Sequence, residues 1–94
     1  MSHFDWNAEK NILLKAERGI SFDEIVLAIE QGHLLNVVQH PNQEQYPNQL
    51  IYVINLQGYV YLVPFVQDGE IIFFKTIIPS RKATRDYLRK GQSK

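Results

Sequence analysis

The middle of the chain is dominated by runs of apolar, β-branched and aromatic residues with short polar turns between them. Runs of this composition and length are typical of strands. Gln57-Gly58 and Asp68-Gly69 separate the last three runs, and both dipeptides favour tight hairpins. The pattern therefore predicts an antiparallel meander of four strands, at residues 33–39, 50–56, 59–66 and 71–78.

Helical periodicity precedes these strands. Asn7 is placed to cap a helix over residues 8–18, because its side chain can accept from a free backbone N–H of the first turn. Ser21 and Glu24 have the spacing of a capping box for a second helix, which Gly32 stops. Two helices of about three turns are therefore expected before the sheet.

The predicted strands are apolar on both faces. One face is expected to carry the two helices, and the other is either covered by a later helix or awaits a partner. Pro64 has no N–H, so it is expected at an edge or a bulge of its strand. Phe4 and Trp6 flank Asp5, an alternation that suits a short edge strand.

A third helix is expected near the end of the chain. Ser80 or Thr84 caps it and Gly91 ends it. At about 100° per residue, Tyr87 and Leu88 fall on one side, where they are expected to pack on the sheet. The opposite side carries a row of cations, Arg81, Lys82, Arg85 and Arg89.

The 94 residues suffice for one domain with one core. The expected fold class is α+β. Two N-terminal helices pack on a four-stranded antiparallel meander, and a basic C-terminal helix follows. A single domain is expected over residues 1–94.

The formal net charge is zero, but the charges are divided along the chain. Residues 1–74 hold three basic and nine acidic residues, which gives −6. Residues 75–94 hold seven basic residues and one acidic residue, which gives +6. This division indicates a charged partner for the C-terminal part.

The composition favours the cytoplasm. The chain has no cysteine, so it has neither a disulfide framework nor a thiolate metal site. Its first ten residues do not read as a signal peptide. No apolar run reaches the ~18–20 residues of a membrane span, so no membrane partner is expected.

Two short blocks are similar to those of a known family. The first combines Phe4, Trp6, Lys10 and Asn11 with the Ile-Ser-Phe-Asp-Glu that follows Gly19. The second is Ile-Pro-Ser-Arg-Lys-Ala-Thr at residues 78–84, which resembles that family's Ile-Ser-Ala-Arg-x-Ala-Thr. In order and spacing the blocks resemble those of the BrnT-type toxins of bacterial type II toxin–antitoxin pairs, of which this chain looks like a divergent branch.

The resemblance implies a RelE-like fold and an endoribonuclease that cleaves mRNA without a metal or other cofactor. It also implies a cognate antitoxin, commonly of the ribbon-helix-helix type, that silences the toxin. DNA would be bound only through the complex with that antitoxin. The family's Lys-His-Gly is replaced here by Glu17, Arg18 and Gly19.

RNA cleavage without a metal needs a base for the 2′-OH proton, a cation for the phosphorane charge and an acid for the leaving oxygen. Arg81 and Arg85 lie one helical turn apart and are candidates to clamp a phosphate. Lys75 precedes them on the last strand and is a candidate for the same site. His40 is a candidate general acid or base, because imidazole exchanges protons near neutral pH.

Further residues are candidates for contact with RNA or with a partner: Arg89, Lys82, Tyr46, Gln49 and Tyr87. Each also has a structural explanation. The cations can form a solvated helix face, Tyr87 can pack on the sheet, and His40 can be a turn residue before Pro41. The three histidines are not spaced as metal ligands, and no metal site is expected.

Two functions therefore remain open. The first is a metal-independent endoribonuclease held in check by an antitoxin. The second is a module without catalysis, whose basic helix docks an acidic partner or nucleic acid. Direct binding of nucleic acid alone is a weaker form of the second.

Overall fold

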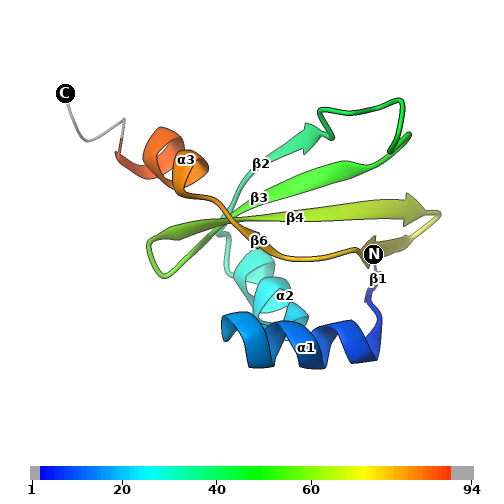
Figure 1. Ribbon diagram of the computed structural model, residues 1–94, viewed down its shortest axis with the longest axis horizontal. Coiled ribbons are helices and arrows are strands. Elements are labelled where there is room, and N and C mark those ends of the chain that lie inside the picture. Colours follow the sequence, from blue (N-terminus) through cyan, green and yellow to red (C-terminus); the bar gives the residue numbers. More distant parts are fainter. Residues whose placement is uncertain (1–2, 90–94) are drawn as a thin grey trace.

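The computed structural model describes residues 3–89, except for the side chain of Arg89. Over these residues helices and strands are combined in one α+β arrangement, as predicted (Figure 1). The helices are α1 (Ala8–Arg18), α2 (Phe22–Glu30) and α3 (Arg81–Thr84), and the π-helical turn η1 (Arg85–Arg89) continues α3. The strands are β1 (His3–Asp5), β2 (Leu34–Gln39), β3 (Leu50–Leu56), β4 (Tyr59–Asp68), β5 (Ile71–Phe74) and β6 (Ile78–Pro79).

The sheet differs from the predicted four-stranded antiparallel meander. Within the described residues it has six strands in the order β1-β5-β4-β3-β2, with β6 also paired to β4. Strands β2 to β5 are antiparallel neighbours, but β1 pairs with β5 in parallel, so the sheet is mixed. A meander leaves the outer edge of its last strand unpaired, and β1 covers that edge.

The predicted strand at residues 71–78 is interrupted. Phe74 pairs with Phe65 and Ile78 pairs with Leu62, so three residues of this segment face two residues of β4. This is a β-bulge. Lys75 donates from its backbone N to the Pro64 carbonyl at 2.8 Å, but Pro64 has no N–H to return. The sequence predicts Pro64 at an edge or a bulge of its own strand, but β4 is central and regular there, and the bulge lies in the neighbouring segment.

The first two helices begin as the sequence predicts. The Asn7 side chain accepts from the Lys10 backbone N at 3.0 Å. The Ser21 side chain accepts from the Glu24 backbone N, and Glu24 accepts from the Ser21 N at 2.7 Å. Burial opposes the charge on Glu24, but hydrogen bonds from Ser21 and Lys15 outweigh it and lower the pKa of this carboxyl.

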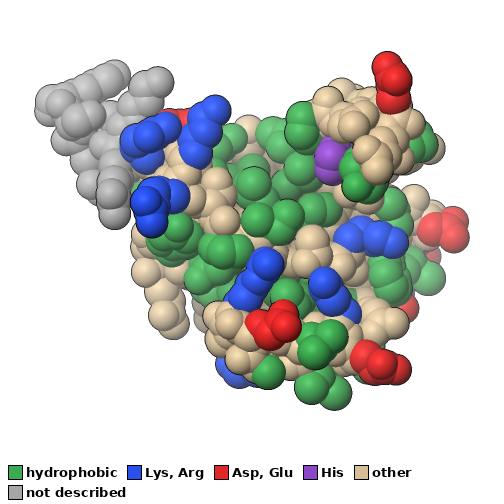
Figure 2. Space-filling view, viewed as in Figure 1, with side chains coloured by type: hydrophobic (Ala, Val, Ile, Leu, Met, Phe, Trp, Pro, Cys, Tyr) green, Lys and Arg blue, Asp and Glu red, His purple; other side chains and the backbone are tan. Residues whose placement is uncertain are grey.

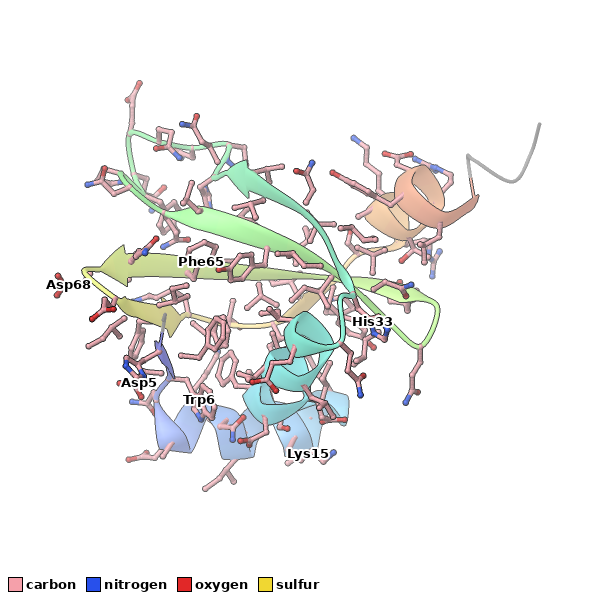
Figure 3. All side chains as sticks on the ribbon, turned by 180° about the vertical axis from the view of Figure 1, so that it is seen from behind. Asp5, Trp6, Lys15, His33, Phe65 and Asp68 are labelled. Atoms are coloured by element: carbon pink, nitrogen blue, oxygen red, sulfur yellow. The ribbon has the colours of Figure 1, made fainter. Side chains whose placement is uncertain are left out.

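The core lies between these helices and one face of the sheet. Phe22 and Phe74 stack at 5.6 Å between ring centroids, and Trp6 lies against both rings. Figure 3, seen from behind, shows Trp6 and Phe65 on the side of the sheet that carries the helices. Phe4 stacks on Phe74 at 5.3 Å, so two aromatic residues of the first sequence block build the core.

Asn11 joins the two helices. Its side-chain oxygen accepts from the Phe22 backbone N at 2.7 Å, and its amide donates to Asp23 at 3.3 Å. The Phe22 N–H is one of the first backbone donors of α2, which have no partner within the helix. A side chain on α1 therefore caps α2 and sets the corner between them.

We predict that Asn11→Ala lowers the free energy of unfolding by about 1–2 kcal/mol, the usual cost of a lost cap. Urea denaturation measures this loss. The matched control is Ile12→Ala on the same helix, because Ile12 is 69% exposed. Equal denaturation midpoints for the two variants would contradict the capping role.

Candidate functional site

The sheet has a second face that the two N-terminal helices do not cover, here called the open face. Side chains alternate between the faces of a strand, so the pairing register assigns each residue to one face. Three rows of side chains cross the open face from β2 towards the β5–β6 edge. They are His40, Gln49, Val66, Phe73 and Asp5; Val38, Ile51, Pro64 and Lys75; and Asn36, Val53, Leu62 and Ile78.

The middle of the open face is apolar. Ile51, Val53 and Pro64 are buried without being part of the core under α1 and α2. Ile78 remains 41% exposed at the edge. In Figure 2, hydrophobic side chains gather between the Lys and Arg side chains over α3 and the β2–β3 loop. The open face is therefore an apolar floor with polar borders.

Helix α3 closes one end of this floor. Thr84 is only 2% exposed; its hydroxyl accepts from the Val60 backbone N at 2.8 Å and donates to the Ser80 carbonyl at 2.7 Å. The Ser80 side chain caps the helix by accepting from the Ala83 N at 3.0 Å. The Tyr87 hydroxyl accepts from the Asn36 side-chain amide at 3.1 Å. Thus α3 and η1 are fixed to the sheet at two points.

The predicted cations of the last helix lie on its exposed surface. Arg81 and Lys82 occupy the first turn, and Arg85 follows with its Nε 3.5 Å from an Asp86 oxygen. This ion pair is exposed, so its contribution to stability is small. The wider turns of η1 alter the predicted alignment of Arg85 with Arg89, whose side chain lies outside the described structure.

Lys75 lies on the open face at the bulge. Its Nζ is 5.5 Å from the centre of the Phe73 ring, a cation–π distance, and its side chain is exposed. Phe73 is not among the candidates that the sequence suggested. Its position two residues before Lys75 could have identified it, because residues two apart on a strand lie on the same face. Lys75, Arg81, Lys82 and Arg85 are here called the basic rim.

The β2–β3 loop forms the opposite border. The His40 and Tyr46 rings lie 4.4 Å apart, and His40 Nδ1 accepts from the Asn42 backbone N at 3.0 Å. That bond leaves Nε2 as the ring nitrogen for a ligand. Gln49 is 9% exposed, and its backbone carbonyl accepts from the His40 backbone N at 3.0 Å.

The structure brings some candidates together and separates others. His40 and Tyr46 meet, and the basic rim follows one stretch of chain along the β5–β6 edge and α3. Three strand spacings separate His40 from the Phe73–Lys75 segment, which is about 14 Å between backbones. His40 and Lys75 therefore share a face but border it on opposite sides.

Arg18 makes a hydrogen bond to the sheet that the sequence did not predict. It lies in the last turn of α1, and its guanidinium donates to the carbonyl of buried Ile77 within the bulge. Residues 59 positions apart meet here. No local pattern identifies such a bond, because it depends on how α1 packs beside the interrupted strand.

No protein-family model matches the chain, and no curated protein matches it. The resemblance to BrnT-type toxins is therefore carried by the two sequence blocks. None of the described helices is long and apolar enough to cross a membrane. Over the described part of the chain, no three His, Asp or Glu side chains come together as a possible metal site.

We predict that Thr84→Val destabilises the protein by about 1–3 kcal/mol, because it leaves the buried Val60 N–H without an acceptor. Thr84→Ser keeps the hydroxyl and is the matched control. Urea denaturation measures the loss, and hydrogen exchange reports the Val60 amide directly. Unchanged protection of that amide in Thr84→Val would contradict the anchoring role.

Proposed function

We propose that this protein is the toxin of a type II toxin–antitoxin pair, a RelE-like, metal-independent endoribonuclease whose basic rim binds RNA phosphate. The observation that carries the proposal is the placement of Lys75 and α3 beside one apolar sheet face. The resemblance of residues 78–84 to the BrnT-type block supports it, since this segment positions Arg81. A cognate antitoxin, RNA and a cytoplasmic location are part of the proposal.

The open face suits a single strand of RNA. Single-stranded nucleic acid binds where cations follow the backbone and aromatic rings stack on bases. The basic rim supplies the cations. Aromatic rings at the borders of the open face come from Phe73, Tyr46 and Tyr87. The apolar floor lowers the local dielectric, which strengthens a charge-assisted bond to phosphate.

Cleavage on this surface follows the chemistry of the 2′-hydroxyl. The 2′-O–H loses its proton to a base, the 2′ oxygen bonds to phosphorus, and the bond from phosphorus to the 5′ oxygen breaks as that oxygen takes a proton. Arg81 and Arg85 stabilise the charge that develops on the phosphorane. Lys75 lies on the same edge and adds positive charge.

His40 has a different role in this proposal from the one that the sequence favoured. At about 14 Å across the sheet from Lys75, it does not share a phosphate with the basic rim in this arrangement. Its free Nε2 and the neighbouring Tyr46 ring are placed to contact a base further along the RNA strand. In this proposal His40 contributes to binding more than to proton transfer at the scissile bond.

We predict that Arg81→Ala lowers RNA cleavage about 100-fold or more, the usual scale for a lost oxyanion donor, and abolishes growth inhibition. Purified protein is tested on free and ribosome-bound mRNA. Lys10→Ala, on the helical side of the sheet, is the matched control and keeps full activity.

Two joint observations would overturn the proposed activity. They are intact mRNA in both assays and an Arg81→Ala variant that inhibits growth as strongly as the wild type. Loss of growth inhibition in Arg81→Ala does not by itself show that Arg81 takes part in cleavage, because a misfolded variant is also harmless. The folding of the variant is therefore compared with that of the wild type by circular dichroism.

The second candidate is a binding module without catalysis, which docks an acidic partner or nucleic acid through the basic rim. The separation of His40 from Lys75 favours it, because the general acid or base suggested by the sequence does not meet the basic rim around one point. Expression without the neighbouring gene distinguishes the two functions. A harmless protein supports the binding module, and a toxic one supports the nuclease.

The nuclease, and the binding module if its partner is nucleic acid, predict salt-dependent binding of single-stranded RNA. For single strands, each phosphate contact contributes about 0.7 to the slope of log K against log salt concentration. Arg85→Ala is therefore expected to reduce that slope by about 0.7, measured by fluorescence anisotropy with a labelled RNA oligomer. Lys10→Ala leaves the slope unchanged, and an unchanged slope in Arg85→Ala would exclude Arg85 from the phosphate contacts.

A further inference from the structure

The outer surface of α1 and α2, here called the helical layer, exposes large apolar side chains. Ile12 is 69% exposed, Leu13 53% and Leu27 52%. Ile12 also borders a shallow hollow that extends over Ala16 to the start of α2. The helices already bury Leu14, Phe22, Ile25 and Ala28 in the core, so these three outward residues are not needed to hold the helices on the sheet.

The helical layer is acidic. Residues 8–30 hold five carboxylates and three cations, which gives −2. Lys15 pairs with Glu24 at 3.1 Å, and Arg18 is turned towards the Ile77 carbonyl at the sheet edge. Glu9, Glu17, Asp23 and Glu30 therefore dominate the outward charge, and all four are exposed.

The opposite side of the sheet has the complementary character. The basic rim, Asp86 and Asp5, which lies beside Phe73 on the same face, together give +2. They border an apolar floor, with Ile78 at its edge and Tyr87 on η1 each 41% exposed. The charge division seen along the sequence is thus also a division between two sides of one molecule. The two sides match each other in charge and in apolar character.

We propose that the open face of one chain binds the helical layer of a second copy, head to tail. The dimensions agree: α1 has 11 residues, about 16 Å, and the four strands β2 to β5 span about 14 Å between their axes. The contact is heterologous, because different surfaces of the two copies meet. It is independent of any nuclease activity, but it covers the surface proposed above for RNA.

The proposal makes a specific statement about assembly. Since a head-to-tail dimer retains one unused open face and one unused helical layer, association continues to larger species as concentration rises. Charge attraction across the contact weakens as salt screens it. A self-complementary contact would instead stop at the dimer.

The test uses two variants of the full chain in analytical ultracentrifugation. The open-face variant is Lys75→Glu with Lys82→Glu, and the helical-layer variant is Ile12→Arg with Leu27→Arg. All four side chains are exposed, so both variants are expected to fold. Asp68→Lys, on the exposed end of β4, is the control for a changed charge elsewhere.

The wild type and Asp68→Lys are expected to gain mass between about 10 μM and 1 mM in about 50 mM salt, and to lose this gain in about 500 mM salt. Each double variant is expected to associate at least about tenfold more weakly, because like charges then meet across the contact. An equimolar mixture of the two variants is expected to regain association, beginning with a species of two chains of about twice 11.0 kDa, because the unchanged helical layer of one variant meets the unchanged open face of the other. Only a head-to-tail contact allows this complementation, because each variant keeps the face that the other lacks.

Three results would overturn the proposal. They are a wild type that stays monomeric throughout this range, association that survives in both variants, and a mixture that stays monomeric while the wild type associates. In the last case the contact would be isologous. RNA cleavage is measured separately on monomeric protein, so failure of self-association leaves the proposed function standing, and the reverse holds as well.

Discussion

Strand β4 is the element on which the rest of the structure depends. This ten-residue strand pairs with β3 along one side and with β5 and β6 along the other, and its Val60 N–H holds α3 through Thr84. Pro64 lies in the middle of this strand and has no N–H to offer the neighbouring segment. That segment therefore leaves regular pairing at Lys75, gains one residue and resumes at Ile78. The bulge sets where Lys75 lies and where the chain turns into α3, so a missing donor in one strand positions the basic rim.

The open face follows from the same constraint. A sheet that is apolar on both sides needs a cover on both sides, or it exposes apolar area. Helices α1 and α2 cover one side, whereas α3 is short and covers only the end near Val60. The remaining floor lies between cations on one border and the His40–Tyr46 pair on the other. The proposed RNA binding and the proposed self-association both draw on this combination of apolar floor and charged border.

Several residues of the two blocks that resemble BrnT-type toxins also have structural roles. Phe4 and Trp6 stack in the core, Asn11 caps α2 and Thr84 anchors α3. Phe4 and Trp6 are constrained by packing, and Asn11 and Thr84 by geometry, since each of the latter two accepts from a backbone N–H. Arg81 is different, because its side chain is exposed, and for this reason it carries the functional proposal.

The sequence by itself determined the local features. The capping box at Ser21 and Glu24, the hairpin turns, the α+β class and the docking side of Tyr87 all follow from spacing and turn chemistry, which act between near neighbours. Tertiary structure alone decided the pairing of β1 with β5, the place of the bulge opposite Pro64, the bond from Arg18 to Ile77 and the distance between His40 and Lys75. These depend on backbone groups far apart in the chain that must find partners when the sheet closes, and no local pattern records which partner each will find.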